Sequence, residues 1–156
     1  MNNYEILLNR SPVSVKETDI LPEQFKGLYA EVLGKKVILI KDRLCTLEKF
    51  CVLAEEIGHY HTTAGNITDQ SKLVNRKHEK RARSWAHEEL IPLTEIISAH
   101  KANVRNRYEL ADFLGVTEGF LGEAIERYVE KYGVCTQVDG FTICFEPLGV
   151  IDWIEF

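Results

Sequence analysis

The alternation of hydrophobic and polar positions predicts strands in the first third of the chain and a helix after them. Residues 28–33 and 35–40 are two short β-rich runs on either side of Gly34, a pattern typical of a hairpin. The apolar residues that follow recur at helical spacing. With Thr46 as its amino-terminal cap, this helix is predicted to run to about Tyr60.

A polar stretch over residues 61–72 predicts a loop, and residues 73–90 predict a second helix. The apolar stripe of this helix consists of Ala82, Trp85, Ala86 and Leu90. Its cationic run, Arg76 to Arg83, is interpreted as a solvated face, with substrate binding by arginine as the alternative. Pro92 suits the first turn of a helix and therefore predicts the start of a third.

The last third of the chain combines two short helices with a hairpin. Within residues 107–132, Gly115 is predicted to end one helix and Thr117 to cap the next. Two short helices joined by such a turn form a helix-turn-helix pattern. Asp139-Gly140 then predicts a type I′ turn between two strands.

Length and composition indicate an ordinary globular protein. The 156 residues are 45% hydrophobic and 28% charged, which leaves room for one or two small domains. The net charge of −5 gives no reason to expect non-specific binding to nucleic acid or to an anionic membrane. No apolar run is long enough to span a bilayer, and the first ten residues lack the features of a signal peptide. We therefore expect a cytoplasmic protein.

The four cysteines show no spacing typical of a zinc site, so they are interpreted as buried, reduced thiols. The turn at residues 139–140 sets a register in which Cys135 lies opposite Cys144, in a pair without backbone hydrogen bonds. A cross-strand disulfide between them is the alternative, although a reducing cytosol disfavours it.

The predicted helix at residues 46–60 carries a group of side chains that could bind a metal ion. Glu55 and His59 are four residues apart, so they point to nearly the same side, and Glu56 is also one turn from His59. With His at position 55 the segment would read HExxH, in which two histidines hold zinc and the glutamate acts on the bound water. A catalytic zinc site has a third protein ligand, and the second helix offers Glu79.

These segments resemble the ImmA/IrrE-type metallopeptidases of mobile elements and stress regulators. The pattern of that family is a hairpin, an LAHExGH helix, and a second helix with ExxAxxFA followed by LLxP. Here the corresponding pieces are LAEEIGH, EKRARSWA and LIP. The resemblance covers about residues 28–92, and a helix-turn-helix such as the one predicted at 107–132 is also typical of the family.

The resemblance implies a role for each residue of the motif. Glu56 corresponds to the general base, and His59 and Glu79 correspond to the second and third zinc ligands. Glu55 stands where the family usually has its first histidine. Two carboxylates and one imidazole make a harder site, so Mn²⁺ and Fe²⁺ are options beside Zn²⁺. His61 is a substitute ligand if the helix unwinds before it, and a chain that binds no metal is the third alternative.

The resemblance also implies a mechanism and a substrate. Glu56 would move a proton between metal-bound water and the leaving amine, with the substrate extended along an edge of the hairpin at 28–41. The substrate would be a helix-turn-helix repressor, whose cleavage relieves repression of phage or mobile-element genes. His78 and His87 are interpreted as surface histidines, with His87 as a minor candidate for an oxyanion partner.

The second helix of the helix-turn-helix argues against DNA binding. Its charged side chains are Glu118, Glu123, Glu126 and Glu130 against Arg127 and Lys131. A helix that docks on phosphates favours the opposite balance, so a structural or protein-docking role is preferred.

Together these observations predict an α+β chain with a zincin-like peptidase domain over 1–102. A helix-turn-helix with a C-terminal hairpin would follow over 103–156. The leading hypothesis is a zinc-dependent endopeptidase that cleaves a repressor. The alternatives are a non-catalytic anti-repressor binding protein on the same fold and, more weakly, a DNA-binding regulator. Oligomeric state is not predicted.

Overall fold

The computed structural model describes residues 1–63 and 72–152, with the backbone alone for residues 72–75. The helices are α1 (Asn3–Arg10), α2 (Thr46–Thr62), α3 (Lys72–Leu90), α4 (Leu93–Lys101), α5 (Arg107–Leu114) and α6 (Glu118–Tyr132). The strands are β1 (Ser14–Thr18), β2 (Gly27–Val32), β3 (Lys35–Lys41), β4 (Cys135–Val138), β5 (Phe141–Phe145) and β6 (Leu148–Asp152). They form two three-stranded sheets, which confirms the mixed α+β class. The chain divides into two compact units, residues 1–86 and 87–156, and the division falls within α3.

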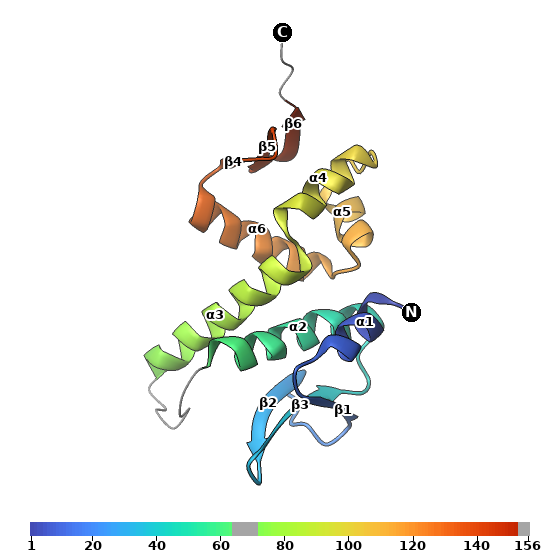
Figure 1. Ribbon diagram of the computed structural model, residues 1–156, viewed down its shortest axis with the longest axis vertical. Helices are drawn as coiled ribbons and strands as arrows, with labels where there is room; N and C mark the ends of the chain where they lie inside the picture. Colours follow the sequence, from blue (N-terminus) through green and yellow to red (C-terminus); the bar gives the residue numbers. More distant parts are fainter. Residues whose placement is uncertain (64–71, 153–156) are drawn as a thin grey trace. The chain divides into compact units, whose positions relative to one another are not determined.

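The sheet of the first unit has the order β1-β3-β2 (Figure 1). Strands β2 and β3 form the predicted hairpin, with Leu33 and Gly34 in its turn at φ values of 53° and 75°. Strand β1 was not predicted, and it pairs in parallel with β3. The apolar residues of β3 are therefore central, with Ile38 and Ile40 fully buried, while β2 is an edge strand.

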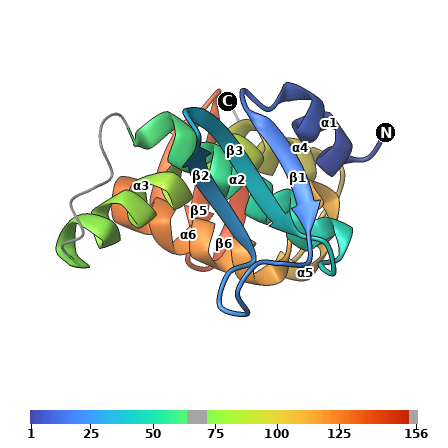
Figure 2. The same cartoon turned by 90° about the horizontal axis from the view of Figure 1, so that it is seen from below.

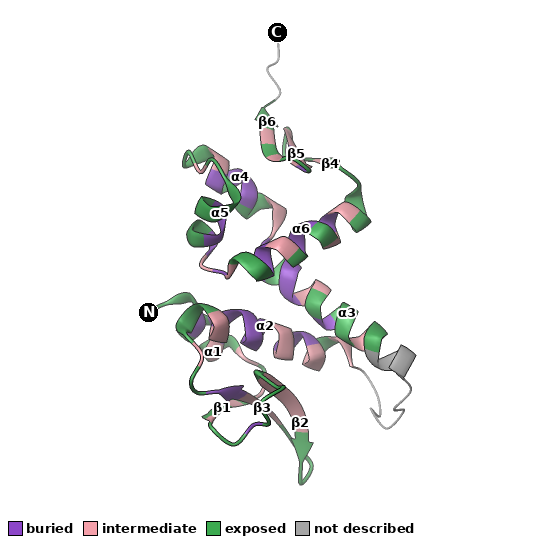
Figure 3. Cartoon of the chain, turned by 180° about the vertical axis from the view of Figure 1, so that it is seen from behind, coloured by how far each residue is buried: buried purple, intermediate pink, exposed green. Residues whose placement is uncertain are grey.

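Helix α2 lies across one face of this sheet (Figure 2). Its buried side includes Leu53, Ala54 and Ile57, and Figure 3 shows the burial along it. The prediction of Thr46 as the cap was wrong by one residue. Cys45 is the N-cap, and the Glu48 carboxylate accepts its backbone N–H at 3.2 Å.

Helix α3 bears out the predicted pattern wherever its side chains are described. Ala82 and Ala86 are fully buried, and the described cationic residues of its polar face are exposed. The predicted loop at 61–72 begins slightly later, because α2 continues to Thr62; most of this loop lies outside the described residues. No helix in the described ranges is long and apolar enough to cross a membrane.

In the second unit the predicted helix boundaries agree closely with the structure. Pro92 precedes α4, and Gly115 closes α5 in the left-handed conformation. The Thr117 side chain accepts the Phe120 backbone N–H at 3.1 Å, which caps α6 as expected.

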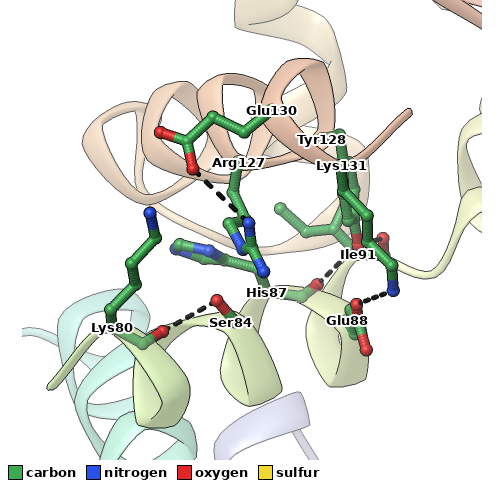
Figure 4. Close-up of polar contacts among 9 residues, drawn as sticks. All are labelled: Lys80, Ser84, His87, Glu88, Ile91, Arg127, Tyr128, Glu130 and Lys131. Carbon is green, nitrogen blue, oxygen red and sulfur yellow. Dashed lines mark hydrogen bonds and ion pairs between the residues drawn. The ribbon is translucent and has the colours of Figure 1, made fainter. Parts of the chain in front are cut away.

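Helix α6 is joined to the segment at residues 87–91 by a buried tyrosine (Figure 4). The Tyr128 hydroxyl donates to the carbonyl of Ile91 at 2.6 Å and lies 3.2 Å from that of His87. On the surface, Lys131 pairs with Glu88.

The C-terminal hairpin has the predicted register, with Val138 opposite Phe141 and Thr136 opposite Ile143. A third strand that was not predicted, β6, pairs with β5. Ile143 and Phe145 face inward and are almost fully buried. The ring of Phe145 packs against Tyr128 at a centroid distance of 5.7 Å, which anchors the sheet to α6.

Candidate functional site

Two helices of the first unit bring an imidazole and a carboxylate together. His59 on α2 and Glu79 on α3 approach to 3.2 Å between Nε2 and Oε1. Their contact depends on the close crossing of the two helices at Gly58. A Cβ atom on Gly58 would collide with the backbone carbonyl of Ala82, so this crossing tolerates no side chain there.

The distance between His59 and Glu79 suits two ligands of one metal ion. Ligands about 2.0–2.1 Å from a tetrahedral zinc ion lie about 3.3 Å from each other. The third donor is not in place: among residues 1–63 and 72–152, no group of three His, Cys, Asp or Glu side chains has an arrangement that could hold a metal ion. The fit is therefore good for two donors, while Glu55 would have to reorient its side chain to become the third.

The third polar side chain of this region is Glu56 on α2, which contacts the backbone of β2 at Tyr29. Burial raises the pKa of its carboxyl to about 7, and the negative charges of Glu55 and Glu79 act in the same direction. His59 and the backbone N–H of Tyr29, which hydrogen-bonds the carboxylate, oppose that rise. Near neutral pH the Glu56 carboxyl is thus poised to gain or lose a proton.

His59 and Glu79 shift each other toward the charged forms. Burial disfavours the imidazolium, yet the hydrogen bond to Glu79 and the charges of Glu56, Glu79 and Glu55 raise the pKa of His59 above its ordinary value. The hydrogen bond to His59 lowers the pKa of the Glu79 carboxyl, burial opposes this, and the His59 and Arg83 charges assist it. In the structure the two side chains are joined by this hydrogen bond, and protonation of His59 makes the contact an ion pair.

The other two candidate ligands, Glu55 and His61, both lie on α2. Glu55 is half-buried one turn before His59, close enough for its charge to act on both His59 and Glu56. His61 stacks on Trp85 with centroids 4.8 Å apart, and α2 is continuous up to and past it. The unwinding that His61 would need to serve as a ligand is therefore absent from α2 as described.

The interpretation of His87 as a surface residue was wrong. Its exposure is 4%, and its ring packs on Phe120 at a centroid distance of 4.9 Å within the second unit. The reason is tertiary packing: α6 covers the His87 ring through Phe120, next to the point where the Tyr128 hydroxyl reaches the His87 carbonyl.

Sequence reasoning missed two contributors from β2. The Tyr29 backbone N–H reaches Glu56, and Gly27 lies where a Cβ atom would be 3.2 Å from the Glu56 carboxylate and 2.5 Å from the Val52 side chain. Both act through the backbone across about 27 residues of sequence. The glycine was visible in the sequence, but only the packing of β2 on α2 explains it.

Comparison with known proteins identifies the family of the chain. No curated protein and no solved structure matches the chain significantly. The family model of the IrrE N-terminal-like domain (Peptidase_M78) matches residues 5–126, which is most of the chain and includes α2, α3 and the residues discussed above. The chain therefore belongs to the IrrE N-terminal-like peptidase family.

Proposed function

We propose that this protein is a metal-dependent endopeptidase whose ligands are Glu55, His59 and Glu79 and whose general base is Glu56. The observation that carries the proposal is the meeting of His59 and Glu79 beside the half-buried carboxyl of Glu56, whose pKa is raised to about 7. Family membership supports a peptidase-type function. A zincin-like arrangement of the sheet, the ligand helix α2 and the second helix α3 is part of the same proposal.

The chain's own residues would handle the proton. Glu56 can accept a proton on its carboxylate and return it to a leaving amine, because its pKa lies near neutral pH. The Tyr29 N–H holds the carboxylate in one orientation while it does so. A zinc ion, or Mn²⁺ or Fe²⁺ in this carboxylate-rich donor set, would polarise the scissile carbonyl and acidify a bound water.

The substrate proposed is a helix-turn-helix repressor, as the family resemblance implies. The sheet order supports an extended mode of binding, since β2 is an edge strand beside Glu56 and can take up another strand. Helices α5 and α6 form the proposed helix-turn-helix of this chain. Glu118, Glu123, Glu126 and Glu130 are all exposed on α6, which supports a role in structure or protein docking over one in DNA binding.

A non-catalytic anti-repressor is the second candidate. It is favoured by the absence of a three-donor group among the described residues and by the carboxylate at position 55. Such a protein would bind the repressor and relieve repression without cutting it.

The decisive experiment combines metal content with cleavage. Protein purified without chelator or histidine tag is expected to hold about one zinc, manganese or iron ion per chain, and Glu79→Ala should lose it. Glu89→Ala is the matched control, because Glu89 is an exposed glutamate on the same helix.

The second arm separates the enzyme from the binder. A helix-turn-helix repressor encoded next to this gene is incubated with wild type and with Glu56→Gln. The enzyme proposal expects fragments from wild type, none from Glu56→Gln, and binding by both. Binding by both without fragments, from a protein that takes up no metal in excess zinc, would establish the anti-repressor instead.

A further inference from the structure

Two cysteines face each other on the outer side of the C-terminal sheet. The register pairs Cys135 on β4 with Cys144 on β5. The next pair, one step farther from the turn at residues 139–140, is Val134 and Phe145. The Phe145 N–H donates to the Val134 carbonyl at 2.8 Å. Bonded and non-bonded pairs alternate in an antiparallel ladder, so Cys135 and Cys144 occupy a non-bonded position.

This position has the geometry that a disulfide needs. Opposite Cα atoms in a non-bonded pair are about 4.5 Å apart, and disulfides span Cα separations of about 4.4–6.8 Å. The two side chains already interact, since a hydrogen bond with Cys135 raises the pKa of the Cys144 thiol. Closing the bond therefore requires little movement of either strand.

The pair is also open to small reagents. The interpretation of all four cysteines as buried was wrong, because Cys135 and Cys45 are exposed and Cys144 is half-buried. On the other side of Cys144 the register places Gly149, where even a Cβ atom would meet no neighbour among the described residues. The other two cysteines differ, because Cys51 is buried and Cys45 caps α2.

We propose that Cys135 and Cys144 form a reversible oxidation site, in which a small disulfide of the glutathione type converts the two thiols into a cross-strand disulfide. The oxidised bond would tie β4 to β5, and low-molecular-weight thiols would release it. The site is independent of the proposed peptidase function, because it rests on the second unit alone.

The reaction balances as two thiol–disulfide exchanges. The Cys135 thiolate attacks one sulfur of the small disulfide, forms a mixed disulfide and expels one thiolate, which takes up a proton. Cys144 then loses its proton and attacks the Cys135 sulfur, which forms the cross-strand bond and expels the second small thiol. Two electrons pass to the reagent. Exposure of Cys135 and the raised pKa of the Cys144 thiol make Cys135 the first nucleophile.

The test uses the full chain with Cys45→Ser and Cys51→Ser, so that only the pair remains. Circular dichroism first checks that this background is folded. It is then treated with oxidised glutathione and analysed by intact mass and thiol counting. The expected product has lost two hydrogens, carries no glutathione, and returns to the reduced mass with dithiothreitol. Adding Cys144→Ser should trap the mixed disulfide on Cys135.

A displaced pair provides the matched control. Thr142→Cys combined with Cys144→Ser keeps two thiols on the same strands and the same face but sets them diagonally. Diagonal Cβ atoms are about 7 Å apart, too far for a disulfide without backbone movement. This variant should accumulate glutathione adducts. If the native pair also stops at adducts, or closes no faster than the displaced pair, the proposal is wrong.

Discussion

The position that a Cβ atom of Gly58 would occupy is taken by the backbone carbonyl of Ala82. Gly58 is one residue before His59 on α2, and Ala82 is three residues after Glu79 on α3. The separation of the two helices at this point therefore sets the distance between the two polar side chains.

Gly58→Ala should consequently destabilise the protein and open the site. The added methyl meets rigid backbone, so we expect a loss of about 2 kcal/mol in the free energy of unfolding, measured by urea denaturation. Gly122→Ala is the control, since Gly122 lies within α6 and its Cβ would meet no described atom. That substitution should stabilise by about 0.5–1 kcal/mol. Equal effects of the two substitutions would show that the crossing is not tight.

Glu55→His tests the role of position 55 directly. If Glu55 is a ligand, a second imidazole in its place should tighten zinc binding by about tenfold or more, because it creates the HExxH donor set. Competition with a chromogenic chelator measures the affinity. Glu48→His is the control, about two turns closer to the helix start and engaged in the cap of α2. Unchanged affinity in Glu55→His would remove position 55 from the ligand set.

Glu56 should make the metal-free protein less stable as pH rises. The pKa of its carboxyl is about 7 in the folded state and near 4.5 in the unfolded state, so the folded state binds more protons between these values. The contribution of Glu56 to stability is thus expected to fall from about pH 4.5 to about pH 7 and to level off above. Glu56→Gln removes this contribution and should gain up to about 3 kcal/mol relative to wild type at pH 8.

The measurement is urea denaturation in chelator at several pH values. Glu89→Gln, the same substitution on an exposed glutamate of α3, is the matched control. A Glu56→Gln profile parallel to that of wild type would contradict the raised pKa.

Tyr128→Phe tests the anchor of α6. The hydroxyl is buried and donates to the Ile91 carbonyl at 2.6 Å, so its removal deletes a buried hydrogen bond. We expect a loss of about 1–2 kcal/mol in the free energy of unfolding. Tyr108→Phe is the control, because Tyr108 is 73% exposed. The loss should appear in calorimetry as a lower midpoint for Tyr128→Phe alone.

The sequence by itself determined most local elements of this protein. Helix periodicity, the cap at Thr117, the stop at Gly115 and the turn at Asp139-Gly140 are all readable locally, because they depend on neighbours within about one turn. The EExxH segment was likewise visible, and its match to the family pattern agrees with the family that the comparison found. Strands β1 and β6 were missed, since their short, mixed sequences become strands only through pairing with β3 and β5.

Only the tertiary structure decided which residues meet. The approach of His59 to Glu79 depends on a helix crossing, and the hydrogen bond from Tyr29 to Glu56 depends on the packing of a strand on α2. The burial of His87 depends on packing against α6. These contacts join residues distant along the chain, and their energies come from desolvation and close packing, which no local pattern encodes.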